Sequence, residues 1–143
     1  MRTVSVAGLA LMVAAMAGLY YVHALLSHSP VVIGVQIAAV ALVIWARITF
    51  GGRSFHAAAN PTEGGLVTSG PYHFVRHPIY TAACLFGWAG ILANVSAVSI
   101  GLGVVLLLGS FMRMLTEERL VTEKYPAYRE YAQVTKRMVP YLF

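Results

Sequence analysis

The stretch "PIYTAACLFGWAGILANVSAVSIGLGVVLLLGSFM" spans residues 78–112 and contains no charged side chain. At 35 residues it is too long for one membrane span, because a helix crosses the hydrocarbon core of a bilayer with about 20 apolar residues. The polar break at 94–96, Asn-Val-Ser, predicts a turn near the middle of the stretch. We therefore expect a helical hairpin made of residues 79–93 and 97–112, and this hairpin decides the fold class.

Two further apolar segments precede the hairpin, at residues 4–26 and 31–50, with a short Ser-His-Ser-Pro turn between them. The first is longer than the apolar core of a signal peptide, which is about 7–15 residues, so we expect it to be retained as a span. Charged residues make up 10% of the chain, against about 25% in soluble domains. The sequence therefore predicts an all-α integral membrane protein with about four transmembrane helices.

The segments around the hairpin are expected to be less regular. Residues 51–77 are rich in glycine and predict a loop. The third helix would have a length of only about 22 Å, so it either starts inside this loop or lies where the membrane is thin.

After residue 112 the pattern predicts a helix that leaves the membrane, an interruption at Pro126, and a second short cytoplasmic helix. Three tyrosines that recur every third residue predict one shared helical face, and they are Tyr125, Tyr128 and Tyr131. The apolar residues 139–143 are expected to return to the membrane interface.

The distribution of basic residues predicts the orientation. The turns at 27–30 and 94–96 carry no lysine or arginine. The other side carries the basic tail together with Arg2, Arg47, Arg53, Arg76 and Arg113. Because basic residues favour the cytoplasmic side, both termini are expected there. The net charge of +5 flanks apolar segments, which is typical of contact with anionic membrane lipid. Nucleic-acid binding would need a clustered basic face, so it is not expected.

A polar cluster adjoins the start of the third span, with five polar side chains in nine residues: Tyr72, His73, Arg76, His77 and Tyr80. Pro78 directs His77 toward extended geometry and favours a helix start there, whose free N–H groups suit an anion. The alternative is an arginine that binds lipid phosphate or snorkels. A His73–His77 metal pair would need a continuous helix, which Pro78 opposes, so no metal site is predicted.

Two further elements could join this cluster. Glu117 and Glu118 directly follow a membrane helix, where carboxylates are costly and tend to mark function. Arg113 lies four residues before Glu117, so a structural salt bridge and two arms of a site both remain open. Gly64, Gly65 and Gly70 would let the loop backbone approach a ligand closely, although they do not form a dinucleotide fingerprint.

Two motifs resemble those of a known family. The run "LVTSGPYHFVRHPIY" is followed, after the hairpin, by "EERLVTEKYPAYREY". This order resembles the isoprenylcysteine carboxyl methyltransferase family, integral-membrane methyltransferases related more distantly to the phospholipid N-methyltransferases. The resemblance covers roughly residue 64 to the C-terminus. It implies S-adenosylmethionine as methyl donor, held at the cytoplasmic ends of the last helices.

Motif position carries the family's roles onto this chain. The resemblance implies cofactor contacts at Gly64, Gly65, Leu66, Val67, Tyr72, His77, Pro78, Ile79, Tyr80 and Glu117. A glutamate suits the ammonium of the cofactor, with Glu118 as the alternative to Glu117, and Arg76 or His77 suits its carboxylate. Arg113 matches the arginine expected to meet the carboxylate of the acceptor, which makes Arg113 and Glu117 the expected catalytic pair.

The resulting interpretation is S-adenosylmethionine-dependent methyl transfer to an amphiphilic or lipophilic acceptor, a carboxylate favoured, that arrives from a bacterial-type inner membrane. A single domain over 1–143 would hold two spans in 1–50 and the cofactor-binding core in 51–143. A membrane reductase that uses a nicotinamide cofactor is one alternative, but it would need more basic residues than Arg53 and Arg76 in the loop. A non-enzymatic membrane scaffold is another. The sequence leaves open the acceptor atom, a general base and the oligomeric state.

Overall fold

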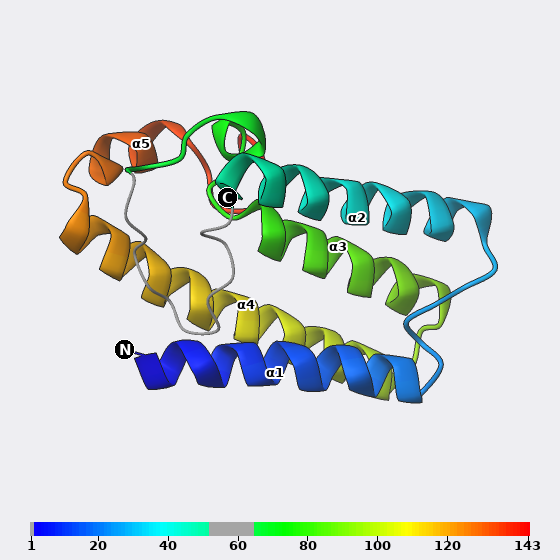
Figure 1. Cartoon of the computed structure of the whole chain (residues 1–143). Helices are drawn as coiled ribbons and strands as arrows, with labels where there is room; N and C mark the ends of the chain where they lie inside the picture. The colour runs from blue at the N-terminus through cyan, green and yellow to red at the C-terminus, as the bar shows by residue number, and fades with distance from the viewer. Residues whose placement is uncertain (1, 52–64) are drawn as a thin grey trace.

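The computed structural model describes residues 2–51 and 65–143. The elements, in chain order, are α1 (Arg2–Tyr21), α2 (Pro30–Phe50), the 3-10 turn η2 (Gly70–His73), α3 (Pro78–Ala93), α4 (Ala97–Lys124) and α5 (Tyr128–Val134). In Figure 1, α1 runs beside α4 and α2 runs beside α3, and both pairs are in contact. The turns that follow α1 and α3 lie at one end of the bundle, and η2 and α5 lie toward the other. The predicted all-helical membrane fold is confirmed.

Three of these helices, α1, α2 and α4, are long and apolar enough to cross a membrane. Helix α3 has 16 residues and therefore a length of about 24 Å, which is less than the bilayer core of about 30 Å. Helix α3 begins at Pro78, which confirms the helix start expected there and rules out the alternative of an earlier start inside the loop. The proline ring sets the backbone angle that begins a helix, and this locates the start.

The first span ends earlier than expected, at Tyr21 rather than residue 26. His23 adopts a left-handed backbone with φ of 56°, and the amide of Ala24 donates to the Leu19 carbonyl at 2.8 Å. A left-handed residue with a bond of this kind is a common way to end a helix. The chain then turns toward α2 over residues 22–29.

Helix α4 is the longest element and projects past the end of α3. A reciprocal capping box begins it, because the amide of Ser99 donates to the Ser96 hydroxyl at 3.0 Å and the amide of Ser96 donates to the Ser99 hydroxyl at 2.9 Å. Its 28 residues reach about 42 Å, so its last turns extend well beyond a bilayer core. The predicted continuation of this helix past residue 112 is confirmed, as is its end just before Pro126.

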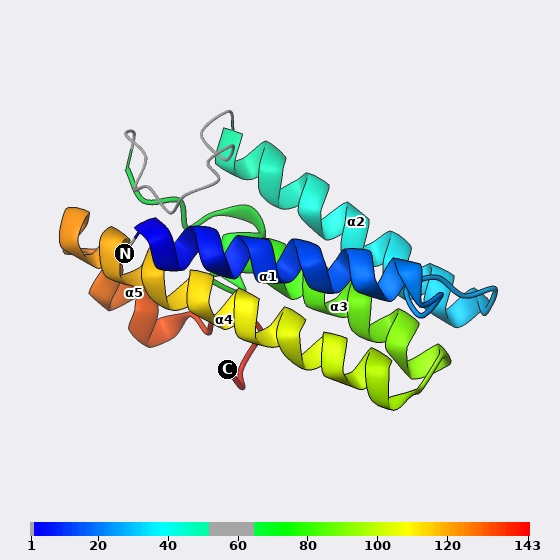
Figure 2. The ribbon, with the colours of Figure 1, turned by 90° about the horizontal axis from the view of Figure 1, so that it is seen from below.

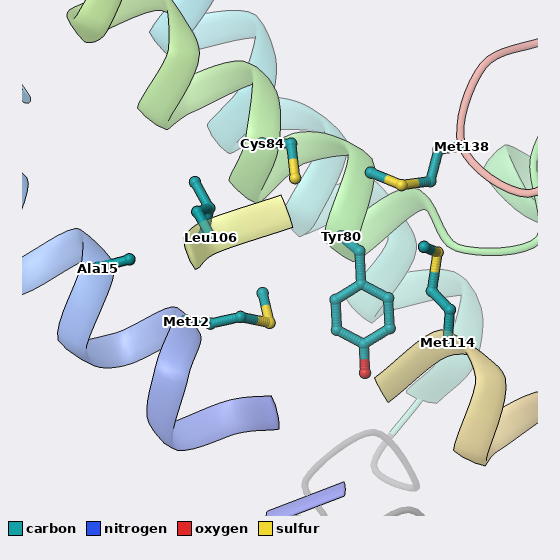
Figure 3. Close-up of a cluster of buried hydrophobic side chains, with 7 residues drawn as sticks. All are labelled: Met12, Ala15, Tyr80, Cys84, Leu106, Met114 and Met138. Carbon is teal, nitrogen blue, oxygen red and sulfur yellow. The ribbon is translucent and has the colours of Figure 1, made fainter. Parts of the chain in front are cut away.

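Small residues let α1 and α4 approach closely, one above the other in Figure 2. A Cβ atom added to Gly8 would lie 2.8 Å from the carbonyl oxygen of Gly109, and one added to Gly109 would lie 2.7 Å from that of Gly8. The nearby core cluster contains Met12, Ala15, Tyr80, Cys84, Leu106, Met114 and Met138. Figure 3 shows the Tyr80 ring in this cluster with its hydroxyl pointing away from Cys84. Tyr80 therefore connects the apolar core to the polar end of the bundle.

The segment after α5 returns to the residues that precede α3. A parallel β-bridge pairs Val75 with Lys136, and Met138 is buried in the core cluster. Tyr125 ends α4, whereas Tyr128 and Tyr131 lie in α5, so the predicted face of three tyrosines is wrong. The return of residues 139–143 to a membrane interface remains a prediction.

Candidate functional site

The polar side chains singled out in the sequence come from two segments, and the structure brings them together at one end of the bundle, except for His73, which is exposed. The residue that precedes α3, His77, has φ of −127° and is buried. Its ψ of 58° places it outside the helical region but short of the extended geometry expected before a proline, so that expectation is wrong in detail. The overhanging part of α4 supplies Arg113, Glu117 and Glu118 opposite this helix start.

One carboxylate, that of Glu117, belongs to a network inside the helix bundle. The buried Arg113 guanidinium donates through Nη2 to Glu117 Oε1 at 3.1 Å and through Nε to the Tyr80 hydroxyl at 2.7 Å. Its Nη1 donates to the backbone carbonyl of Ser5 in α1 at 3.3 Å. The Tyr80 hydroxyl in turn donates to Glu117 Oε1 at 2.5 Å. A buried charge needs such complete pairing, and the network supplies it from three helices.

The second carboxylate, that of Glu118, is more buried and is surrounded by cationic groups. Arg76 Nη1 lies 3.2 Å from Glu118 Oε1, and His77 Nε2 lies 3.1 Å from the same oxygen. Arg137 donates to Oε2 from Nη2 at 3.0 Å and from Nε at 3.2 Å. Paired charge-assisted hydrogen bonds of this kind are the strong ones in proteins.

The ring of His77 lies between the two glutamates. Its Nε2 meets Glu118, and its Nδ1 lies 3.9 Å from Glu117 Oε2. Because an ionised carboxylate only accepts hydrogen bonds, His77 carries its proton at Nε2 in the contact with Glu118. Glu117 is 27% exposed against 12% for Glu118, so Glu117 is the glutamate with room for another partner.

Buried tyrosines line the same region outside the membrane-spanning helices. Burial, together with the Glu117 carboxylate, raises the pKa of Tyr72 to about 12. Burial, together with Glu118, raises the pKa of Tyr128 to about 12. Both phenols therefore stay neutral at physiological pH. The Tyr131 hydroxyl donates to the carbonyl of Tyr72 and links α5 to η2.

A comparison with protein families matches residues 31–128, from α2 to the first residue of α5, to the phospholipid methyltransferase family. The chain belongs to the phospholipid methyltransferase family. The resemblance drawn from the motifs is thereby confirmed at the level of this group of membrane methyltransferases. The matched residues include the polar start of α3 and, in α4, Glu117 and Glu118.

The chain is also similar to a curated protein, the cobalt-zinc-cadmium resistance protein CzcN of Cupriavidus metallidurans. The two are 32% identical over 114 residues, which cover 77% of this chain and 47% of CzcN. The chain thus spans about half the length of this relative. No solved structure matches the chain significantly.

In this member of the phospholipid methyltransferase family, seven of the residues chosen from the sequence lie together at the polar end of the bundle. They are Tyr72, Arg76, His77, Tyr80, Arg113, Glu117 and Glu118. Pro78 is buried and starts α3, and Ile79 is half-buried in its first turn.

The glycine-rich segment of the expected site has fewer described contacts than the polar side chains. Gly64 lies outside the described residues, and Gly65, Leu66 and Val67 form no regular element. Gly65 has φ of 88°, a left-handed conformation that favours glycine. Among the residues that the structure describes, a Cβ atom at Gly65 would meet nothing within 4 Å.

Gly70 belongs to η2 and has a different constraint. Its φ is 57°, and a Cβ atom would lie 2.5 Å from the Thr49 hydroxyl oxygen of α2. This position requires glycine for both its backbone angle and its close contact.

Sequence reasoning missed two partners of the site. Arg137 contacts Glu118, and the Ser5 carbonyl accepts from Arg113. Neither belongs to a motif or to a local spacing, and both lie outside the family match, so nothing in the sequence pointed to them. In the described part of the chain, no group of three or more His, Cys, Asp or Glu side chains is arranged to hold a metal ion.

Proposed function

We propose that the chain transfers the methyl group of S-adenosylmethionine to an amphiphilic or lipophilic acceptor that reaches the site from the bilayer. The observation that carries the proposal is the position of His77 between two glutamates, at the polar end of membrane helices in a chain of this family. A small site of this kind offers both signs of charge to a ligand that is itself both cationic and anionic.

The residues present fit the cofactor by their chemistry. Glu117 is ionisable and partly exposed, which suits the ammonium of the amino-acid tail. The first turn of α3 presents backbone N–H groups beside Arg76 and His77, which suits a carboxylate. Tyr72 adds a buried neutral phenol near Glu117. When bound, S-adenosylmethionine supplies a methyl group already activated on its sulfonium.

The protein's own task is then alignment and exclusion of water. Tyr80 and Arg113 fix the Glu117 carboxylate through a shared oxygen, which limits its rotation. We assign Arg113 to the acceptor carboxylate, and its partner Glu117 is partly open to solvent. Holding donor and acceptor in line lowers the entropic part of the barrier. A carboxylate acceptor would need no general base at neutral pH.

The same proposal places the site and both termini on the cytoplasmic side of a bacterial-type inner membrane. The two turns that share one end of the bundle contain no lysine or arginine, whereas the end with η2 and α5 is basic. Membrane lipid then surrounds the helices, and the acceptor reaches the site from the membrane.

The decisive experiment is transfer of tritiated methyl from S-adenosylmethionine by the purified protein into extracted lipids and peptides of the host. We expect label in a lipophilic product. In parallel, thermal unfolding is followed with S-adenosylmethionine and with a nicotinamide cofactor. Stabilisation by the nicotinamide alone, without any methyl transfer, would favour the reductase alternative and overturn the proposal.

A further inference from the structure

The segment that follows α5 is tied to the start of α3 by backbone hydrogen bonds. The amide of Arg76 donates to the Lys136 carbonyl at 2.8 Å, and the amide of His77 donates to the Arg137 carbonyl at 2.9 Å. The Thr81 hydroxyl donates to the Met138 carbonyl at 2.9 Å. These contacts hold residues 135–138, here called the tail, directly beside two cluster residues.

The side chain of Arg137 extends this attachment into the cluster. It makes three hydrogen bonds of 3.0–3.2 Å to the two oxygens of Glu118. Arg76 and His77 contact Oε1, whereas Arg137 contacts both oxygens, Oε2 through Nε and Nη2. A carboxylate that is gripped on both oxygens cannot rotate freely, which makes Arg137 the group that sets its plane.

The orientation of the Glu118 carboxylate in turn sets the orientation of the His77 ring. His77 Nε2 lies 3.1 Å from Glu118 Oε1, and this contact directs His77 Nδ1 toward Glu117 Oε2 at 3.9 Å. Arg137 therefore acts on Glu117, the more exposed glutamate, through Glu118 and His77, and it does not contact Glu117 itself. Because Arg137 lies beyond the residues matched to the family, its part in the site is additional to what the family match covers.

We propose that Arg137 is a positioning residue, which holds Glu118 so that His77 and the start of α3 keep the arrangement needed to bind the cofactor. The effect on cofactor binding rests on the proposed function, whereas the effect on the tail and on His77 does not. Residues 135–138 then belong to the site, because they hold its side chains in place.

The test uses the full chain in detergent or nanodiscs. Arg137→Gln removes the charge, Arg137→Lys keeps it without the forked geometry, and Arg129→Gln is the matched control, since Arg129 is an exposed arginine of α5. The first measurement is hydrogen exchange of segments 74–80 and 135–138, and the second is the affinity for S-adenosylmethionine by calorimetry together with KM and kcat.

In Arg137→Gln we expect exchange in both segments to rise, and the Kd and KM for S-adenosylmethionine to rise by about tenfold, as for loss of one hydrogen-bonded charge. We expect kcat at saturating cofactor to change much less, Arg137→Lys to be intermediate, and Arg129→Gln to match wild type. If Arg137→Gln does not fold, Arg137→Lys decides by the same two measurements.

Unchanged exchange in the Arg137 variants would overturn the proposal, and so would raised exchange with unchanged affinity. If wild-type protein binds no S-adenosylmethionine at all, the proposed function fails. The exchange measurement then decides by itself whether Arg137 positions the His77 segment. A fall in kcat with unchanged Kd would also contradict the inference, since it would assign Arg137 to the chemical step.

Discussion

The hydroxyl of Tyr80 in α3 donates to Oε1 of Glu117 in α4 at 2.5 Å, across 37 positions of sequence. The same hydroxyl accepts from Arg113 Nε at 2.7 Å, so it completes a closed set of hydrogen bonds where α3 and α4 meet. This relationship joins packing and chemistry, because the ring of Tyr80 belongs to the apolar core and its hydroxyl holds the accessible glutamate.

Removing that hydroxyl should destabilise the bundle. In Tyr80→Phe, Arg113 Nε loses its acceptor and Glu117 loses a donor, which we expect to cost about 1–3 kcal/mol of unfolding free energy. Thermal unfolding in detergent measures this loss. Tyr141→Phe is the control, because Tyr141 is 90% exposed. Equal melting temperatures for the two variants would contradict the role of the network.

Glu117 and Glu118 should respond differently to loss of charge. We expect Glu117→Gln to abolish S-adenosylmethionine binding and to lower stability, because the buried Arg113 loses its charged partner, while the tail stays in place. We expect Glu118→Gln to lower stability and loosen the tail, because Glu118 binds Arg76 and Arg137. Calorimetry and hydrogen exchange of residues 135–138 separate the two effects. Glu123→Gln, a change at an exposed position of α4, is the control. Loss of S-adenosylmethionine binding in Glu118→Gln but not in Glu117→Gln would assign the cofactor to Glu118.

His77→Ala and Arg113→Ala should separate donor binding from turnover. We expect His77→Ala to lose cofactor binding, since its ring joins the helix start to both glutamates. We expect Arg113→Ala still to bind S-adenosylmethionine, more weakly because Glu117 loses one of the two groups that fix it, and to lose methyl transfer, because the acceptor loses its cationic partner. Circular dichroism checks that both variants remain helical. Normal turnover in Arg113→Ala would remove Arg113 from the acceptor site.

The contact between α1 and α4 should tolerate no side chain at Gly109. In Gly109→Ala the new Cβ atom would lie 2.7 Å from the Gly8 carbonyl oxygen, a backbone atom that cannot swing away. We expect a loss of about 1–3 kcal/mol from this overpacking. Gly101→Ala is the matched control in the same helix, because its Cβ atom would meet nothing within 4 Å and alanine favours helix. Thermal unfolding of both variants makes the comparison, and equal losses would argue against close helix packing.

Stability should fall at alkaline pH. The pKa values of Tyr72 and Tyr128 rise from 10.0 to about 12 on folding, so the unfolded chain loses these protons first. Their contribution is therefore fully present below pH 10 and is lost as pH rises toward 12. Unfolding experiments across this window, with tyrosinate absorbance as the second readout, measure the effect. We expect the double variant Tyr72→Phe and Tyr128→Phe to show a shallower fall, and an identical slope would contradict it.

The sequence by itself determined the number and order of the membrane helices and the place where α3 starts. A bilayer imposes a length on every apolar helix, so an uncharged run of 35 residues with a polar break near its middle has few other solutions. Proline restricts its own backbone, so the helix start at Pro78 followed from the sequence, whereas the ψ of 58° at His77 did not. The pair of Arg113 and Glu117 follows from helical spacing alone.

Only the tertiary structure decided what the two glutamates contact. Consecutive residues of a helix point about 100° apart, so the sequence indicates that Glu117 and Glu118 diverge but not what each one meets. Their partners come from distant segments, with Glu117 meeting Tyr80 and Glu118 meeting Arg137. No local periodicity relates such residues, since the folding of the tail against the start of α3 is what brings Arg137 to Glu118. The rotation of α4 against α3 then leaves one carboxylate partly exposed and buries the other more deeply.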